Sequence, residues 1–249
     1  MNDTTPTLSG QQADTAAPRG AVRASWRRLA GVALAVLGTA ALLALTTGIG
    51  QQRADDIGRY FLYQGTGLVV AALVVVGVSL LSGRALLRWG RLAAPSRRVT
   101  VLGVKAGESW LRIGITFTLI ISAVTGLFLF LAYRDQLGGV APASWLLALA
   151  IAIPLSATNA LTEELITRWV VVESLTGSWA RVAPWVSAVI FGGVHVFGIP
   201  GGPTGALMAG FLGWLLARSI QDTRGLGWAW IVHFCQDILI FTVTIALFV

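Results

Sequence analysis

Five ionisable side chains of this sequence lie well inside long apolar stretches: Glu163, Glu164, His195, His233 and Asp237. A charge at the centre of a membrane-spanning helix costs roughly 2.5 to 3.5 kcal/mol on insertion scales, so such residues usually face a partner or a water-filled cavity. Carboxylates and imidazoles are also groups that transfer protons near neutral pH. These five residues are therefore the candidates for chemistry.

Their spacing predicts which of them share a helix face, because residues four apart point the same way. Glu164 and Arg168 have this spacing, and so do His233 and Asp237. Arg168 suits Glu164 as an ion-pair partner and leaves Glu163 without a local counter-charge. A buried pair that only locks helix packing needs one carboxylate, so the second glutamate requires another explanation.

The elements that must hold these residues are long apolar segments. Of 249 residues, 55% are hydrophobic and only 12% are charged, with a mean hydropathy of +0.76. A soluble domain devotes roughly a quarter of its residues to charged types. A helix of about 20 residues spans the ~30 Å hydrocarbon core. We therefore predict an all-α, polytopic transmembrane helical bundle of about seven spans, eight being possible, with a polar intramembrane cavity. The predicted spans are 29–49, 60–81, 113–133, 143–175, 182–199, 204–217 and 226–249.

The basic residues indicate orientation. With seven spans and a cytoplasmic N-terminus, fifteen basic residues fall on the inner side and three, Arg53, Arg59 and Arg134, on the outer side. The positive-inside rule therefore predicts a cytoplasmic tail and an outward-facing Val249. The inner loop at 84–112 forms either a short interfacial helix or a simple basic anchor. Seventeen of the eighteen basic residues are Arg, which suggests a GC-rich bacterial genome and hence a bacterial plasma membrane.

Three short motifs carry a family resemblance. They are Glu163 to Arg168 (EELITR), Phe191 to His195 (FGGVH) and His233 to Asp237 (HFCQD), in this order on separate apolar segments. Together they resemble the motifs of the CPBP intramembrane proteases. That family includes type II CAAX prenyl endopeptidases and bacterial bacteriocin-processing or self-immunity proteins. Many members have Asn where this chain has Asp237, a variant also seen in the family.

The resemblance implies an intramembrane glutamic endopeptidase with a catalytic set of Glu163, Glu164, His195, His233 and Asp237, and Arg168 as a structural ion pair. In that interpretation Glu163, with His195, deprotonates a water that attacks the scissile carbonyl. His233 and Asp237 stabilise the oxyanion or orient its donors. The polar composition of residues 1–27 predicts a disordered cytoplasmic tail, and the apolar runs predict N-terminal transmembrane helices with the basic cytoplasmic loop at 28–142. The resemblance implies that 143–249 is the protease core.

The same residues also fit other functions. A non-catalytic scaffold or bacteriocin self-immunity protein could retain the same fold. A proton-coupled transporter could use the same charges as a relay, although the sequence shows no internal repeat. Two His and a Glu could also hold a zinc ion, but the sequence contains no His-Glu-x-x-His helix, so we favour a site without a cofactor.

We expect a membrane-bound peptide or protein substrate, contact with the lipid bilayer and no nucleic acid. Cys235 points away from His233 and is expected to be a packing residue.

Overall fold

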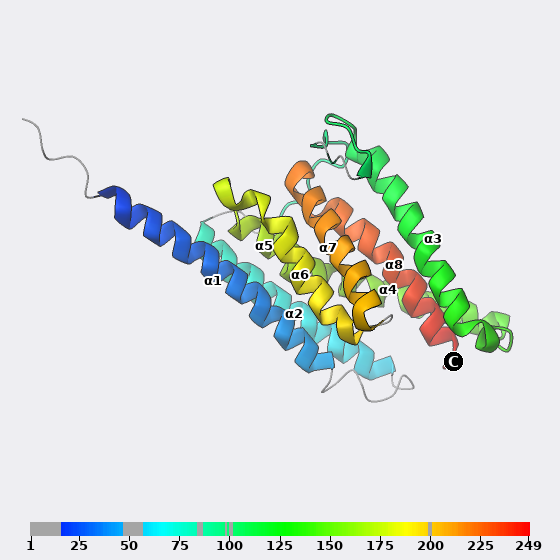
Figure 1. The fold of residues 1–249 in the computed structure, drawn as a ribbon. Coiled ribbons are helices and arrows are strands. Elements are labelled where there is room, and N and C mark those ends of the chain that lie inside the picture. The colour runs from blue at the N-terminus through cyan, green and yellow to red at the C-terminus, as the bar shows by residue number, and fades with distance from the viewer. Residues whose placement is uncertain (1–15, 47–56, 84–86, 98, 100–101, 199–200) are drawn as a thin grey trace, which may run out of the picture.

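The chain folds as a set of packed helices in the computed structural model, which describes residues 16–46, 57–83, 87–97, 99, 102–198 and 201–249, without the side chains of 16–23 and 57. Within these ranges the regular structure is helical (Figure 1). The α-helices are α1 (Ala16–Leu45), α2 (Ile57–Ser82), α3 (Trp110–Leu137), α4 (Pro142–Glu164), α5 (Val170–Ser174), α6 (Ala183–Val194), α7 (Gly202–Thr223) and α8 (Gly227–Ala246).

The helices coincide with the predicted apolar segments, which confirms the all-α class. Five helical stretches of the described residues are long and apolar enough to cross a membrane, and they indicate an integral membrane protein. They are Ala24–Leu45, Gly58–Ser82, Trp110–Leu137, Pro142–Ser174 and Gly227–Ala246. The other two predicted spans are also helical, but α6 is short and α7 does not meet the same criteria. Length and composition therefore establish five candidate spans of the predicted seven.

Two local expectations differ from the structure. The first helix begins at Ala16, within the segment predicted to be a disordered tail. Ala and Arg have high helix propensity, so they extend the helix beyond its hydrophobic part toward the N-terminus. Residues 1–15 lie outside the described residues. A short interfacial helix was one of the two alternatives for the loop that starts at residue 84; the described residues between 87 and 109 form mainly turns and isolated bridges, and residues 84–86 lie outside the described residues. Gly90, at φ 82°, places that backbone against Gly225 at the α7–α8 turn.

The fourth predicted span is one continuous helix with a change of winding. A π-helical segment, Leu165–Trp169, joins α4 to α5. Single π turns inside α-helices occur frequently at functional sites. Here the π turn starts directly after Glu164 and contains Arg168, so two of the candidate residues lie at the irregular part of the helix.

Helices α6 and α7 cross closely, as the small residues of the 205–213 segment predict. A Cβ atom on Gly213 would lie 3.0 Å from the Ser187 carbonyl oxygen, and one on Gly192 would lie 2.6 Å from that of Ala206. Only glycine allows backbones this close. This contact fixes the end of α6, where His195 lies, against the rest of the bundle.

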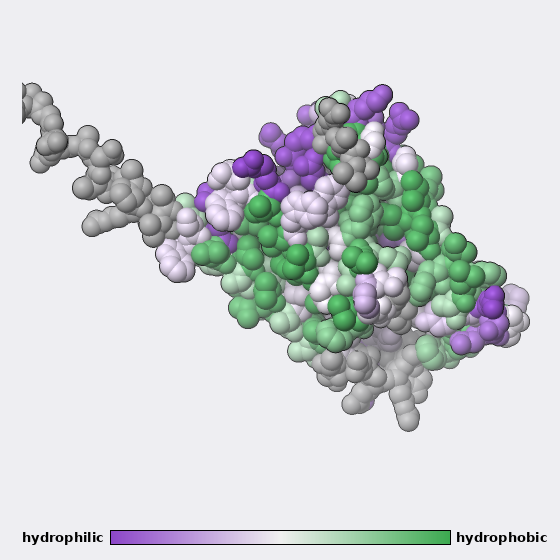
Figure 2. Space-filling model, in the orientation of Figure 1, coloured by the Kyte–Doolittle hydropathy of each residue, from purple (hydrophilic) through white to green (hydrophobic). Residues whose placement is uncertain are grey.

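One end of the bundle carries most of the polar surface. Hydrophilic side chains gather over the ends of α5 and α7 and the starts of α8 and α3, while the flanks are apolar (Figure 2). This end, which we call the basic face, holds the described part of the 84–112 loop. Its described basic residues are Arg27, Arg28, Arg88, Arg91, Arg97, Lys105, Arg112, Arg181, Arg218 and Arg224.

Candidate active site

Three helices bring the predicted residues together. Glu163 and Glu164 end α4, His195 directly follows α6, and His233 and Asp237 lie on consecutive turns of α8. The helices α4 and α8 pack against each other, and the Trp230 indole N–H donates to the Ala157 carbonyl oxygen at 3.1 Å across this contact. The resemblance of the three motifs implied that these residues form one set, and the structure brings them together.

Glu164 and Arg168 form the predicted ion pair. Arg168 Nη1 lies 2.6 Å from Glu164 Oε1, and both side chains are completely buried. The same carboxylate oxygen lies 2.7 Å from His233 Nδ1, so the pair also reaches across to α8. The Arg168 guanidinium stacks 3.6 Å from the centroid of the Phe191 ring on α6. Glu164 is thus a structural centre that joins three helices, and it does not line the pocket described below.

Glu163 has no ion-pair partner on its own helix, as the four-residue spacing of Glu164 and Arg168 predicted. Its side chain is 20% exposed, and its Oε2 atom lies 3.6 Å from His233 Nε2, which also lies 3.5 Å from Asp237 Oδ1. That Oε2 atom makes no hydrogen bond with the described residues, although it is buried. The missing local counter-charge is therefore supplied across the helix interface by His233, at a distance longer than a direct hydrogen bond.

Two amide side chains belong to the site and were missed by sequence reasoning. Asn159 Nδ2 donates to Glu163 Oε1 at 3.3 Å and to Asp237 Oδ2 at 3.0 Å. Gln64 Nε2 on α2 donates to Asn159 Oδ1 at 3.2 Å, which fixes the orientation of the Asn159 amide. Asn159 lies four residues before Glu163, so the helix spacing that revealed Arg168 could have indicated it.

His195 lies at the point where α6 changes to a 3₁₀ turn, His195–Phe197. Its Nδ1 atom lies 2.8 Å from the Phe191 carbonyl oxygen. A carbonyl can only accept, so Nδ1 carries the proton, and in the neutral ring Nε2 has a free lone pair. Phe191 packs against this ring with a centroid distance of 4.1 Å.

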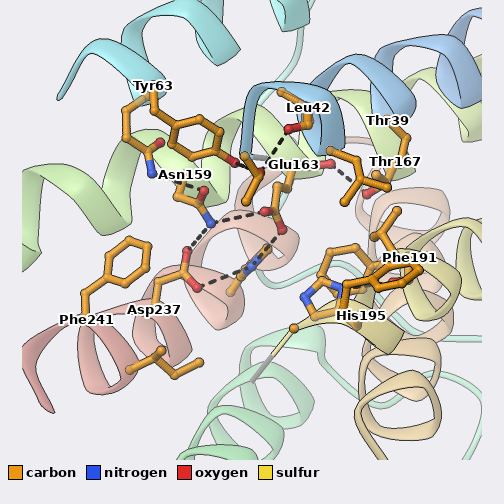
Figure 3. A pocket seen from close by; sticks show the side chains of 18 of the residues that line it. Thr39, Leu42, Tyr63, Asn159, Glu163, Thr167, Phe191, His195, Asp237 and Phe241 are labelled. Carbon is orange, nitrogen blue, oxygen red and sulfur yellow. Dashed lines mark hydrogen bonds and ion pairs between the residues drawn. The ribbon is translucent and has the colours of Figure 1, made fainter. Parts of the chain in front are cut away.

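The site borders a pocket of about 340 Å³. In Figure 3 Asn159, Glu163 and Asp237 point toward one another on one side of it, with His195 across from them. Side chains from α1 and α2 complete the wall, among them Leu42, Thr46 and Tyr63. Cys235 does not line this pocket, in agreement with the packing role predicted for it. Of the five candidates, Glu163, His195, His233 and Asp237 face the pocket.

The residues that the structure describes contain no cluster of three His, Cys, Asp or Glu side chains spaced to hold a metal ion. His195 Nδ1 and His233 Nδ1 are both occupied by other contacts, with Phe191 and Glu164. A metal at this site would therefore have to use the Nε2 atoms.

Residues 140–239 match the family described as type II CAAX prenyl endopeptidase, Rce1-like. Neither the comparison with curated proteins nor that with solved structures found a significant match. The matched range begins just before α4 and ends just after Asp237, so it covers the three motifs and the helices that carry them. Residues 140–239 are thus an Rce1-like type II CAAX prenyl endopeptidase domain, and membership of this family implies a protease that acts on a protein substrate.

Proposed function

We propose that the protein hydrolyses a peptide bond of a membrane-associated peptide or protein, with a water molecule activated by Glu163. The observation that carries this proposal is the hydrogen bonding of the two Glu163 carboxylate oxygens. Asn159 holds one oxygen, while the other is buried at the pocket without a hydrogen-bond partner among the described residues. A buried acceptor left unsatisfied costs free energy, so it favours a water molecule at that position.

His195 completes the water site from the opposite wall of the pocket. With its proton on Nδ1, its Nε2 atom can accept a proton from the water or, once protonated, donate one. In the proposed step the water oxygen bonds to the scissile carbonyl carbon, and its proton passes to Glu163. The carbon–nitrogen bond then breaks, and the leaving nitrogen takes that proton back. Glu163 thus acts first as the general base and then as the general acid, while the Nε2 atom of His195 holds the water in place.

His233 supplies positive charge where the oxyanion forms. Glu164, which pairs with Arg168, accepts from His233 Nδ1, and two further carboxylates lie within 3.6 Å of Nε2. These three acids favour an imidazolium, which stabilises developing negative charge in a site of low dielectric. Asp237 would repel an oxyanion directly, so it acts through His233. Glu164 and Arg168 position His233 and do not touch the substrate.

The depth of these groups supports an intramembrane site. At 1.5 Å per residue, Glu163 lies about 16 Å from the end of α5 at Ser174, and Asp237 lies about 15 Å from the start of α8 at Gly227. His195 lies about 18 Å beyond Ala183. All three distances are about half of the ~30 Å hydrocarbon thickness. The pocket is therefore proposed to be a polar cavity at mid-membrane.

A scaffold or self-immunity protein with the same fold is the alternative, and removal of both histidines separates the two functions. The double variant His195→Ala, His233→Ala should lose all cleavage and any protection that depends on cleavage. The measurement is substrate processing in cells that accumulate wild-type and variant protein to equal levels. Protection that survives in the double variant would establish the scaffold function instead.

The zinc alternative predicts a different set of results. Purified active protein would contain about one zinc per chain, and activity would be lost with a chelator and recovered with the metal, because catalytic zinc is held by three protein ligands and a water. The glutamate mechanism predicts activity without stoichiometric metal. Metal analysis and chelator treatment of the same preparation decide between them.

Topology is a separate expected result. Reporter fusions should place residues 20 and 95 in the cytoplasm and residue 55 and the C-terminus outside, because the basic residues concentrate on one side of the predicted spans. A cytoplasmic C-terminus would show that one predicted span does not cross. The segment 204–217, now part of α7, would be the first to examine.

A further inference from the structure

A chain of amide hydrogen bonds joins three helices at the site. Gln64 Nε2 on α2 donates to Asn159 Oδ1 on α4 at 3.2 Å. Asn159 Nδ2 donates in turn to Glu163 Oε1 at 3.3 Å and, across to α8, to Asp237 Oδ2 at 3.0 Å (Figure 3). Gln64 lies outside the matched range 140–239, so a part of the chain that the family match does not cover contributes to this site.

The hydrogen-bonding groups of this chain allow one arrangement of the two amides. An ionised carboxylate only accepts hydrogen bonds, so Asn159 must turn its Nδ2 atom toward Glu163 and Asp237. Its Oδ1 atom then faces Gln64, which must present its own Nε2 atom. Turning over either amide, or both, would bring two donors or two acceptors together. Gln64 is buried, with 4% exposure, so it is shielded from competing water.

Asn159 also determines which oxygen of Glu163 is available for chemistry. Because the amide holds Oε1, the oxygen left at the pocket without a hydrogen-bond partner among the described residues is Oε2. The opposite side of the two carboxylates faces His233, whose Nε2 atom lies 3.6 Å from Glu163 Oε2 and 3.5 Å from Asp237 Oδ1. The Glu163 carboxylate is thus held between an amide and an imidazole.

The amide lies between two like charges. Glu163 Oε1 and Asp237 Oδ2 both lie within 3.3 Å of Asn159 Nδ2, and carboxylates this close repel each other in a medium of low dielectric. The two N–H groups of the amide offset that repulsion and oppose rotation of the Glu163 carboxylate. Orientation matters for a general base, since a misplacement of about 1 Å can cost roughly 10²-fold in rate.

We propose that Asn159, oriented by Gln64, is a positioning residue for the reaction, which holds Glu163 Oε1 so that Oε2 alone is presented to the water. This inference rests on the proposed function of Glu163 as the base. Asn159 is not itself a catalytic residue, because both its N–H groups and its carbonyl oxygen are already engaged. An amide that only locks α4 against α2 and α8 would affect stability and leave turnover by the folded protein unchanged.

Steady-state kinetics of the purified full-length protein test this role. The probe is a synthetic peptide that spans a cleavage site found by N-terminal proteomics in wild-type membranes. Asn159→Ala should lower kcat and kcat/KM together by about 10²-fold with KM unchanged, because the amide does not touch the substrate. Gln64→Met keeps Asn159 but removes the donor that orients it, so kcat should fall in the same way by a smaller factor. Gln136→Ala removes an exposed amide at the end of α3 and should match the wild type.

An exchange of two side chains separates positioning from charge balance. Asn159→Asp combined with Asp237→Asn keeps one amide and two carboxylates in the cluster, but it replaces the donor to Glu163 Oε1 by an acceptor. The exchange variant should therefore recover stability relative to Asn159→Asp alone, measured by thermal unfolding. Its kcat should stay about 10²-fold below that of Asp237→Asn alone.

A wild-type kcat in Asn159→Ala, or a raised KM at unchanged kcat, would overturn the inference, as would an exchange variant that turns over as fast as Asp237→Asn. If Asn159→Ala does not accumulate, a wild-type kcat in Gln64→Met overturns it instead. Glu163→Gln is assayed on the same peptide. Wild-type cleavage by that variant would mean that the proposed function fails, whereas an inactive Glu163→Gln beside an unimpaired Asn159→Ala would remove only the role of Asn159.

Discussion

Glu163→Gln is expected to abolish cleavage while the protein inserts and unfolds as the wild type does. Glutamine keeps the shape of the side chain and the contact with Asn159 but cannot take a proton from water. Loss of a general base typically costs about 10²- to 10⁴-fold in rate, which would bring processing close to background. The measurements are substrate cleavage and thermal unfolding of the purified protein in detergent.

Stability is the control within this experiment. Neutralising a partly buried carboxylate removes a desolvation cost, so the variant should be as stable as the wild type or more stable. His195→Ala should behave in the same way, with lost cleavage and a retained fold. A Glu163→Gln protein that cleaves at the wild-type rate would rule out Glu163 as the base. A variant that fails to accumulate would mean that the carboxylate is structural.

Arg168→Ala is expected to destabilise the protein as well as inactivate it. The guanidinium is completely buried, pairs with Glu164 and stacks on Phe191. Its removal leaves a buried carboxylate with one partner fewer, and breaking a buried pair in this way typically costs about 3 to 5 kcal/mol. We therefore expect poor accumulation in membranes and a lower unfolding temperature, measured beside the wild type.

Two further variants identify the cause of that loss. Arg181→Ala removes an exposed arginine and should change stability by no more than about 0.5 kcal/mol. The double variant Glu164→Gln, Arg168→Ala removes the stranded charge and should recover part of the stability lost in Arg168→Ala. If Arg168→Ala were as stable as Arg181→Ala, the buried ion pair would not hold these helices together.

The elements and the contacts within one helix could be predicted from the sequence. Apolar runs locate the helices because a segment that spans the membrane must be long and hydrophobic. The four-residue spacing predicted the Glu164–Arg168 pair and the proximity of His233 to Asp237, and both are observed. Gly213 and its neighbours likewise predicted a close helix crossing.

Contacts between helices were less predictable. The amide of Asn159 joins Glu163 on its own helix to Asp237 on another, and Gln64 orients it from a third helix. Polar amides inside apolar helices carry no charge that marks them in a sequence. The backbone of Arg88 and Trp89 accepts hydrogen bonds from the start of α8, and Trp89 packs on Trp230, contacts that depend on tertiary packing and that the spacing of basic and apolar residues in the loop did not indicate.

The central claim is that Glu163 makes this chain a protease of membrane substrates, and the new N-termini of membrane proteins test it most directly. Membranes from cells that contain wild-type or Glu163→Gln protein at equal levels are compared by N-terminal proteomics. We predict N-termini that are present only with the wild type and that lie within or next to hydrophobic segments of membrane proteins or peptides. Identical sets of N-termini in the two membranes, at matched accumulation and with a substrate-dependent phenotype intact, would contradict the claim.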